Sequence, residues 1–103
     1  MSKERVAAGI KNSLCFGLYK SEKQIGFARV VTDFSRFAYL LDVFIIDAHK
    51  GKGYEKLLIK HIMESKDLQV DKWLLGTNDA HGLYAKYGFT AIKESHRLME
   101  KRK

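Results

Sequence analysis

The sequence of 103 residues contains one cysteine, no proline and no long apolar run. The single cysteine, Cys15, excludes an intrachain disulfide and a zinc site built from several thiolates. No stretch approaches the roughly 18 consecutive apolar residues that a membrane-spanning helix needs. Residues 1–11 are polar and of mixed charge, unlike a signal peptide. We therefore expect a cytoplasmic protein that binds no membrane.

The size and charge of the chain limit what it contains. A length of 103 residues suits one hydrophobic core, so residues 1–103 are expected to form a single domain. The formal net charge is +7, and Lys101, Arg102 and Lys103 at the end of the chain supply three of these charges. The remaining excess is too small to indicate a nucleic-acid-binding protein. The four histidines show no metal-ligand spacing, so we expect no metal ion.

Hydrophobic patterning predicts an α+β domain, or a mixed-sheet α/β domain. Two β-type runs separated by the polar residues 21–23 predict an antiparallel hairpin. The almost wholly apolar run 38–46 predicts a strand at the centre of the sheet, buried on both faces. The expected elements are a helix over 4–12, strands over 13–20, 24–33, 38–46 and 72–76, helices over 54–66 and 79–87, and closing strands over 89–92 and 97–100.

The loop from His49 to Gly53 is the strongest local signal of a binding site. Its glycines allow backbone N–H groups to turn toward an anion, and the helix that follows adds the positive end of its dipole. Lys50, Lys52 and Lys56 surround the loop with positive charge, which favours a ligand with several phosphate charges. The P-loop and dinucleotide-binding glycine patterns are absent. The alternative is a solvated basic turn that only begins a helix.

Four segments along nearly the whole chain resemble one family when they are taken together and in order. They are Gln24-Ile25-Gly26-Phe27-Ala28-Arg29-Val30, Asp42-Val43-Phe44-Ile45, Lys50-Gly51-Lys52-Gly53, and residues 79–89 with the sequence DAHGLYAKYGF. These segments resemble the GNAT superfamily of N-acetyltransferases, which transfer an acetyl group from acetyl-CoA to an amine. The resemblance implies a central, mostly antiparallel sheet with two main helices packed on it.

The resemblance also implies a set of cofactor-binding residues. In the family, loop amides hold the CoA pyrophosphate, and the strand before the loop pairs with the pantetheine arm and the acetyl carbonyl. The three signature positions of the loop are Lys50, Gly53 and Glu55, and Glu55 departs from the family pattern because a small residue is usual there. The residues that the resemblance assigns to acetyl-CoA are Val43, Phe44, Ile45, Lys50, Gly51, Lys52, Gly53, Tyr54, Glu55, Lys56 and Asn78.

Tyr84 matches the family tyrosine that protonates the departing CoA thiolate, and Tyr87 is the alternative. A phenol, with an ordinary pKa near 10, remains protonated at neutral pH until the leaving group develops charge. Asp42, in an apolar strand, is expected to bind or deprotonate the substrate amine, or else to be satisfied by nearby polar groups. His81 is placed on a helix that approaches the cleft, and His49 on the loop surface.

The resemblance favours an N-acetyltransferase that works by direct attack of a small-molecule or other amino-group acceptor. The alternative is a catalytically inactive module that binds CoA or a partner, which Glu55 favours because a carboxylate repels phosphates. Nonspecific nucleic-acid binding is the third and weakest hypothesis, since no RNA-binding aromatic motif is present. The sequence begins near the end of the family's second helix. We therefore expect a homodimer, or a partner protein, to complete the shortened domain.

Overall fold

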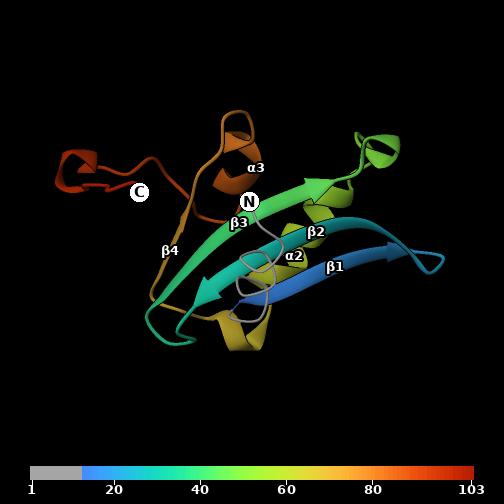
Figure 1. Cartoon of the computed structure of the whole chain (residues 1–103), viewed down its shortest axis with the longest axis horizontal. Coiled ribbons are helices and arrows are strands. Elements are labelled where there is room, and N and C mark those ends of the chain that lie inside the picture. The colour runs from blue at the N-terminus through green and yellow to red at the C-terminus, as the bar shows by residue number, and fades with distance from the viewer. Residues whose placement is uncertain (1–12) are drawn as a thin grey trace.

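The computed structural model describes residues 13–103, which form a four-stranded sheet in the order β1-β2-β3-β4 (Figure 1). Strands β1 (Leu14–Lys20), β2 (Lys23–Thr32) and β3 (Phe37–Ile45) are antiparallel neighbours, and β4 (Lys72–Leu75) joins β3 in parallel. The expectation of a mixed, mostly antiparallel sheet with two main helices is confirmed. The remaining elements are η1 (Asp47–His49), α2 (Tyr54–Met63), η2 (Lys66–Leu68), α3 (His81–Ala85) and η3 (Ser95–Arg97).

The hairpin between β1 and β2 has a two-residue turn, shorter than the three residues expected. Ser21 and Glu22 both adopt left-handed backbone conformations, with φ of 51° and 68°. A turn of this hand matches the twist of the two strands. Lys23 therefore belongs to β2, where it lies directly opposite Lys20.

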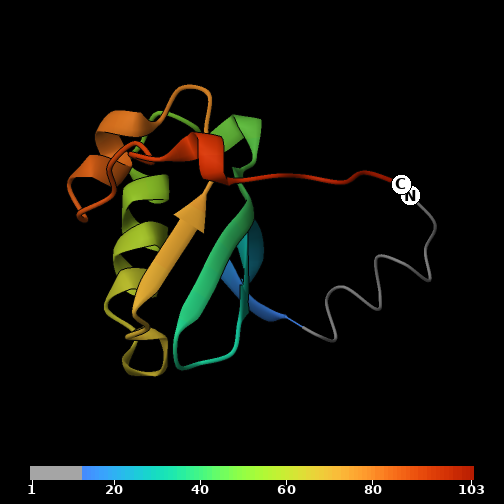
Figure 2. The same ribbon diagram turned by 90° about the vertical axis from the view of Figure 1, so that its left-hand side faces the viewer.

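Strand β3 occupies the interior of the sheet, as expected, but the prediction that both of its faces are buried is wrong. Ala38 and Leu40 are buried beneath α2, whereas Tyr39 is 42% exposed and Phe44 is 49% exposed. Alternate side chains of a strand point to opposite faces, and α2 lies against one face (Figure 2). Because one layer of helices covers the sheet in the described part of the chain, the second face of β3 remains accessible.

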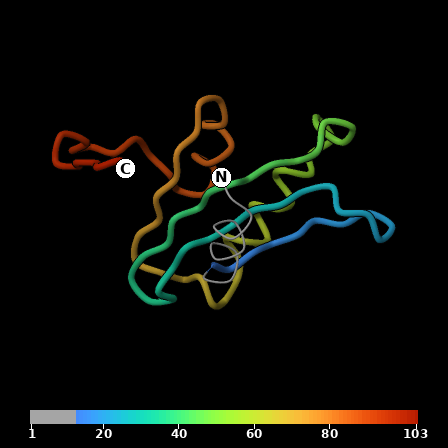
Figure 3. Tube along the Cα trace, viewed as in Figure 1, coloured from blue at the N-terminus to red at the C-terminus, as the bar shows by residue number. Residues whose placement is uncertain are grey.

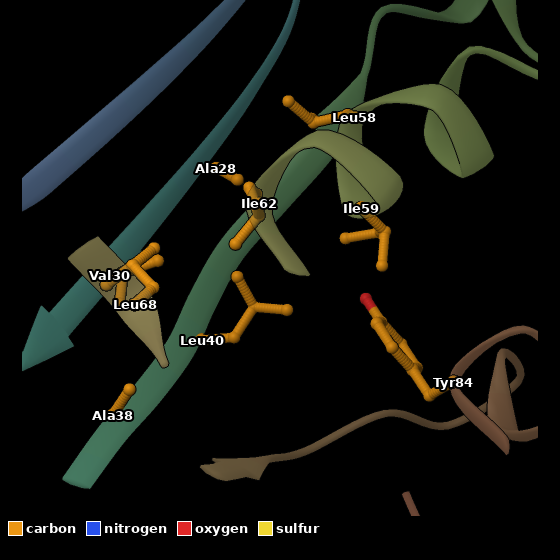
Figure 4. Packing of buried hydrophobic residues seen from close by; sticks show 9 residues of the cluster. All are labelled: Ala28, Val30, Ala38, Leu40, Leu58, Ile59, Ile62, Leu68 and Tyr84. Carbon is orange, nitrogen blue, oxygen red and sulfur yellow. The ribbon is translucent and has the colours of Figure 1, made fainter. Parts of the chain in front are cut away.

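The hydrophobic core lies between this sheet and α2. Leu58, Ile59 and Ile62 of α2 face small and branched side chains of β2 and β3, and Leu68 lies beside Val30 (Figure 4). Tyr84 enters the same cluster from α3. Full burial of each large apolar side chain contributes about 1.5–3 kcal/mol, so α2 anchors the loop that precedes it. The strand residues of the cluster are Ala28, Val30, Ala38 and Leu40.

The C-terminal part of the chain differs most from the expected elements. The helix α3 is shorter than the predicted span 79–87: it ends at Ala85, with Lys86 as its C-cap, and Gly88, with φ of 92°, lies in the turn that follows and not at the expected stop. The predicted strands over 89–92 and 97–100 are absent from the sheet. Phe89 instead packs edge-to-face against Trp73 and Tyr84, at centroid distances of 6.4 and 5.7 Å. The predicted helix over 4–12 lies outside the described residues. Within residues 13–103, no helix has the length and hydropathy needed to cross a membrane.

Candidate functional site

Strands β3 and β4 separate at one end of the sheet and leave an open edge. Their ladder contains four residue pairs and ends at Leu40 and Leu75, where β4 stops. Strand β3 continues to Ile45 without a β4 partner in the described part of the chain. The backbone N–H and C=O groups on this edge of β3 are therefore available to another extended chain.

A bulge reshapes β3 at the start of this open edge. Phe27 pairs with Phe44 and Arg29 with Leu41, so β3 contains one more residue than β2 over this stretch. Asp42 takes up the extra residue with a left-handed φ of 56°. Bulges of this kind bend a strand and redirect its side chains and backbone groups. The bulge thus turns residues 43–45 toward the gap between β3 and α3.

Two adjoining cavities follow the open edge. The larger has a volume of about 560 Å³ and the smaller about 260 Å³, and both are lined by Val43, Glu55 and Asp79. The larger cavity brings together most of the sequence-predicted cofactor residues. They are Val43, Phe44, Ile45, Lys50, Gly51, Gly53, Tyr54, Glu55 and Lys56. Lys52 and Asn78 lie outside the lining of both cavities.

The loop before α2 is built to present backbone N–H groups. Gly51 and Gly53 have φ of 77° and 83°, a region in which residues with a Cβ are strained. A Cβ at either position would meet no atom within 4 Å, so backbone conformation, not space, requires glycine there. Gly53 caps α2, no side chain caps the helix, and the first N–H groups of α2 lack intrahelical partners. An anion at this helix end would be stabilised by those N–H groups and by the helix dipole.

Charged side chains of both signs surround this helix end. Lys50 donates a hydrogen bond to Asp47, with Nζ and Oδ1 2.8 Å apart. This contact holds the pKa of Lys50 above its ordinary value and that of Asp47 below it. Lys56 forms no ion pair with another described residue. Glu55, in the first turn of α2, adds a half-buried carboxylate next to these cations.

Tyr84 places a phenol at the inner end of the smaller cavity. The side chain is 6% exposed, and its hydroxyl points from α3 toward Ile59 of α2 (Figure 4). The hydroxyl forms no hydrogen bond within residues 13–103. Burial, followed by the negative charge of Glu55, raises the pKa of Tyr84 above its ordinary value, so the phenol is protonated at neutral pH. Tyr87 lines a different cavity, together with Trp73.

Asp42 lines the smaller cavity, and its carboxylate has a partner. Asp42 Oδ2 lies 3.1 Å from Nε of Arg29, and the Asp42 side chain is 57% exposed. The ion pair satisfies the carboxylate without burying it, so an incoming ammonium group could still reach it. His81 lines neither cavity, although it begins α3.

Three residues that line the larger cavity are absent from the sequence-predicted site: His49, Asp79 and Leu83. His49, expected on the loop surface, lines this cavity and packs its ring against Tyr54 at a centroid distance of 6.0 Å. Asp79 precedes α3 and lines both cavities. The alternation of polar and apolar residues indicates neither His49 nor Asp79, because both lie in connections between the main elements, whose path depends on tertiary packing. No group of three His, Cys, Asp or Glu side chains within residues 13–103 could hold a metal ion.

The family model of the acetyltransferase (GNAT) domain matches residues 11–91. The chain belongs to the GNAT acetyltransferase family. A GNAT-family protein of known structure from Xanthomonas campestris pv. campestris is 46% identical, with a TM-score of 0.90 over 96% of this chain and 70% of that one. A GNAT acetyltransferase from Elizabethkingia anophelis with acetyl-CoA bound has the same fold, at 22% identity and a TM-score of 0.68. That match covers 86% of this chain and 61% of the Elizabethkingia chain.

A curated relative from Gibberella zeae carries a name that assigns it as an acetyltransferase by inference. The alignment extends over 74 positions at 28% identity and covers 54% of this chain. The chain thus matches 42% of the length of that relative. Membership of the GNAT family supports acetyl transfer as the class of reaction. It also makes acetyl-CoA the ligand whose fit to the two cavities has to be tested.

Proposed function

We propose that the protein transfers the acetyl group of acetyl-CoA to an amine by direct attack. The observation that carries the proposal is the meeting of three features at two adjoining cavities: the open edge of β3, the glycine loop before α2 and the hydroxyl of Tyr84. A cavity of about 560 Å³ falls in the range that encloses small-molecule ligands, roughly 300–1,000 Å³. The acceptor amine is either a small molecule or an amino group on a larger one.

The residues present fit the two chemically different halves of acetyl-CoA. The free N–H groups of the loop and the ammonium groups of Lys50 and Lys56 suit its pyrophosphate. On the edge of β3 away from β2, residues 43–45 have no ladder partner in the described part of the chain, and this edge suits the amide-containing arm because an extended chain can pair with a free strand edge. The thioester then lies in the gap between β3 and α3, beside Tyr84.

Bond formation and cleavage at the thioester need one hydrogen-bond donor, one acid and a neutral amine. The amine nitrogen attacks the carbonyl carbon, the C–N bond forms, and the C–S bond breaks without a covalent enzyme intermediate. Backbone N–H groups near Ile45 stabilise the developing oxyanion, and Tyr84 donates its proton to the departing thiolate. Asp42 holds the amine and accepts the proton that it loses.

The second candidate function is a module that binds CoA or a partner without catalysis. Glu55 favours it, because its carboxylate lines both cavities beside the anion-binding loop. Two like charges about 4 Å apart repel each other by about 4 kcal/mol at an effective dielectric constant near 20. Solvent at this half-buried position reduces that repulsion, so weakened binding is the consequence expected of Glu55.

Calorimetric titration with acetyl-CoA at two salt concentrations tests the proposal. The natural chain is compared with Glu55→Gln, which removes the charge, and with Glu55→Gly, which also removes the bulk. Saturable one-to-one binding by the natural chain, followed by acetylation of at least one amine in a panel, supports the enzyme. Binding without turnover of any amine supports the module. Absence of binding by all three proteins contradicts both functions.

The expectations of a homodimer and of a cytoplasmic location stay predictions. Sedimentation across micromolar concentrations tests the first, and a strict monomer would contradict it. Cys15 is a free, half-buried thiol, which suits a reducing compartment and supports the second.

A further inference from the structure

The end of the β1–β2 hairpin carries two lysines, Lys20 and Lys23, that form no ion pair within residues 13–103. Lys20 and Lys23 lie directly opposite each other, an arrangement that is destabilising for like charges. Glu22 lies in the turn between them, yet it forms no ion pair with either lysine. Lys52, in the loop before α2, is likewise without an ion pair within residues 13–103. Lys50 differs from these three lysines because Asp47 already partners it.

The sheet register brings this hairpin end to the mouth of the larger cavity. The N–H of Ile46 donates a hydrogen bond of 2.8 Å to the carbonyl of Ile25, so the loop after β3 begins beside the start of β2. Figure 3 shows the hairpin turn and this loop at the same end of the sheet. Nζ of Lys20 lies 5.9 Å from the ring centroid of Tyr54, a residue that lines the cavity. The hairpin end therefore lies next to a wall of the cavity, although none of its residues lines the cavity.

The positive charges of Lys20, Lys23 and Lys52 all act on His49. Its ring packs against the same Tyr54, and its Nδ1 atom is buried without a hydrogen-bond partner among residues 13–103. Burial, and then the positive charges of Lys52, Lys20 and Lys23, hold the pKa of His49 below its ordinary value. Three lysines from two separate segments thus act on one point of the cavity wall.

We propose that Lys20, Lys23 and Lys52 form a second phosphate subsite, which takes the phosphate monoester on the ribose of coenzyme A. The inference rests on the proposed function, because the pyrophosphate of the same ligand must occupy the glycine loop. A phosphate monoester carries between one and two negative charges at pH 7, which the three ammonium groups, none of them ion-paired in the described part of the chain, can balance. The subsite makes the protein selective for coenzyme A over dephospho-coenzyme A, which lacks this phosphate.

The test compares the binding of coenzyme A and dephospho-coenzyme A by calorimetry. We expect a preference of about tenfold for coenzyme A, which corresponds to about 1.4 kcal/mol, or about 0.5 kcal/mol for each of three exposed ion pairs. We expect Lys20→Gln/Lys23→Gln to lose most of this preference and to bind dephospho-coenzyme A within about twofold of the natural chain. Lys66→Gln/Lys72→Gln removes the same charge from exposed lysines elsewhere, so it should keep the preference.

Four outcomes decide the matter. Equal binding of both nucleotides by the natural chain overturns the subsite and leaves the proposed function standing. An equal loss in the control variant overturns the subsite in favour of general charge attraction. Binding of neither nucleotide overturns the proposed function and the subsite with it. A preference for coenzyme A that is lost only in Lys20→Gln/Lys23→Gln supports the subsite. NMR titration of His49 provides an independent test: the pKa of His49 should rise more with coenzyme A than with dephospho-coenzyme A.

Discussion

Replacement of Tyr84 by Phe removes one oxygen from the inner end of the smaller cavity. The ring keeps its edge-to-face contact with Phe89 at 5.7 Å and its place in the core. The lost hydroxyl has no hydrogen-bond partner in the described part of the chain, so its removal should change the free energy of unfolding by no more than about 1 kcal/mol. If Tyr84 is the acid, kcat should fall by about 10² to 10⁴, equivalent to about 3–5 kcal/mol in the activation barrier.

The assay follows release of the CoA thiol with an amine that the natural chain acetylates, and calorimetry measures acetyl-CoA binding in parallel. The affinity for acetyl-CoA should stay within about twofold, because the hydroxyl acts on the leaving group late in the reaction. Tyr87→Phe is the matched control, since Tyr87 lines neither cavity of the site. Its rate should equal that of the natural chain.

The pH dependence of the free energy of unfolding tests the environment of Tyr84 a second time. Because folding raises the pKa of Tyr84, its contribution to stability is fully present below its unfolded pKa near 10. That contribution is lost as the pH rises through the folded pKa. Tyr84→Phe should therefore lose less stability than the natural chain at alkaline pH, as measured by urea unfolding. An unchanged kcat in Tyr84→Phe would remove Tyr84 as the acid, whatever the stability data show.

Three further substitutions test other parts of the structure. Asp42→Asn tolerates the left-handed backbone and loses the charge that faces the half-buried Arg29, so it should cost about 1 kcal/mol in urea unfolding. If Asp42 holds the amine, the KM for amine rises while acetyl-CoA affinity stays unchanged. Ile59→Ala should destabilise the fold by about 2–5 kcal/mol, whereas Leu57→Ala, on the exposed side of α2, should cost less than about 1 kcal/mol in the same measurement. Gly53→Ala should weaken acetyl-CoA binding in calorimetry and cost about 1–2 kcal/mol of stability, because φ of 83° is strained for alanine.

The sequence predicts the antiparallel hairpin, the position of β3 and the helix after the glycine loop, because each rests on local periodicity or turn chemistry. It predicts most of the larger cavity for a different reason. Backbone groups of the loop and of β3 form much of that site, and their positions follow once the strand, loop and helix are placed in order.

The errors arise where tertiary contacts override local preference. Residues 89–92 have β-type residues but no ladder partner, and Phe89 gains more by packing on Trp73 and Tyr84 than it could at a free strand edge. The bulge at Asp42 depends on one left-handed residue. Aspartate adopts that conformation more readily than the apolar residues around it, so its place within β3 is the signal that could have revealed the bulge.

The parallel pairing of β3 with β4 has a consequence for the order in which the molecule assembles. Strands β1 to β3 pair with their neighbours in sequence, whereas β4 reaches β3 only after α2 has been crossed. Contacts between distant segments close more slowly than local ones, so the open edge should take shape after the antiparallel strands have folded. The amide hydrogens of β4 should also exchange first with solvent in the folded protein, through openings that leave β1 to β3 paired. Trp73 lines neither cavity of the site. Slower exchange of its amide hydrogen upon ligand addition would therefore show that a ligand in those cavities stabilises the pairing of β4 with β3.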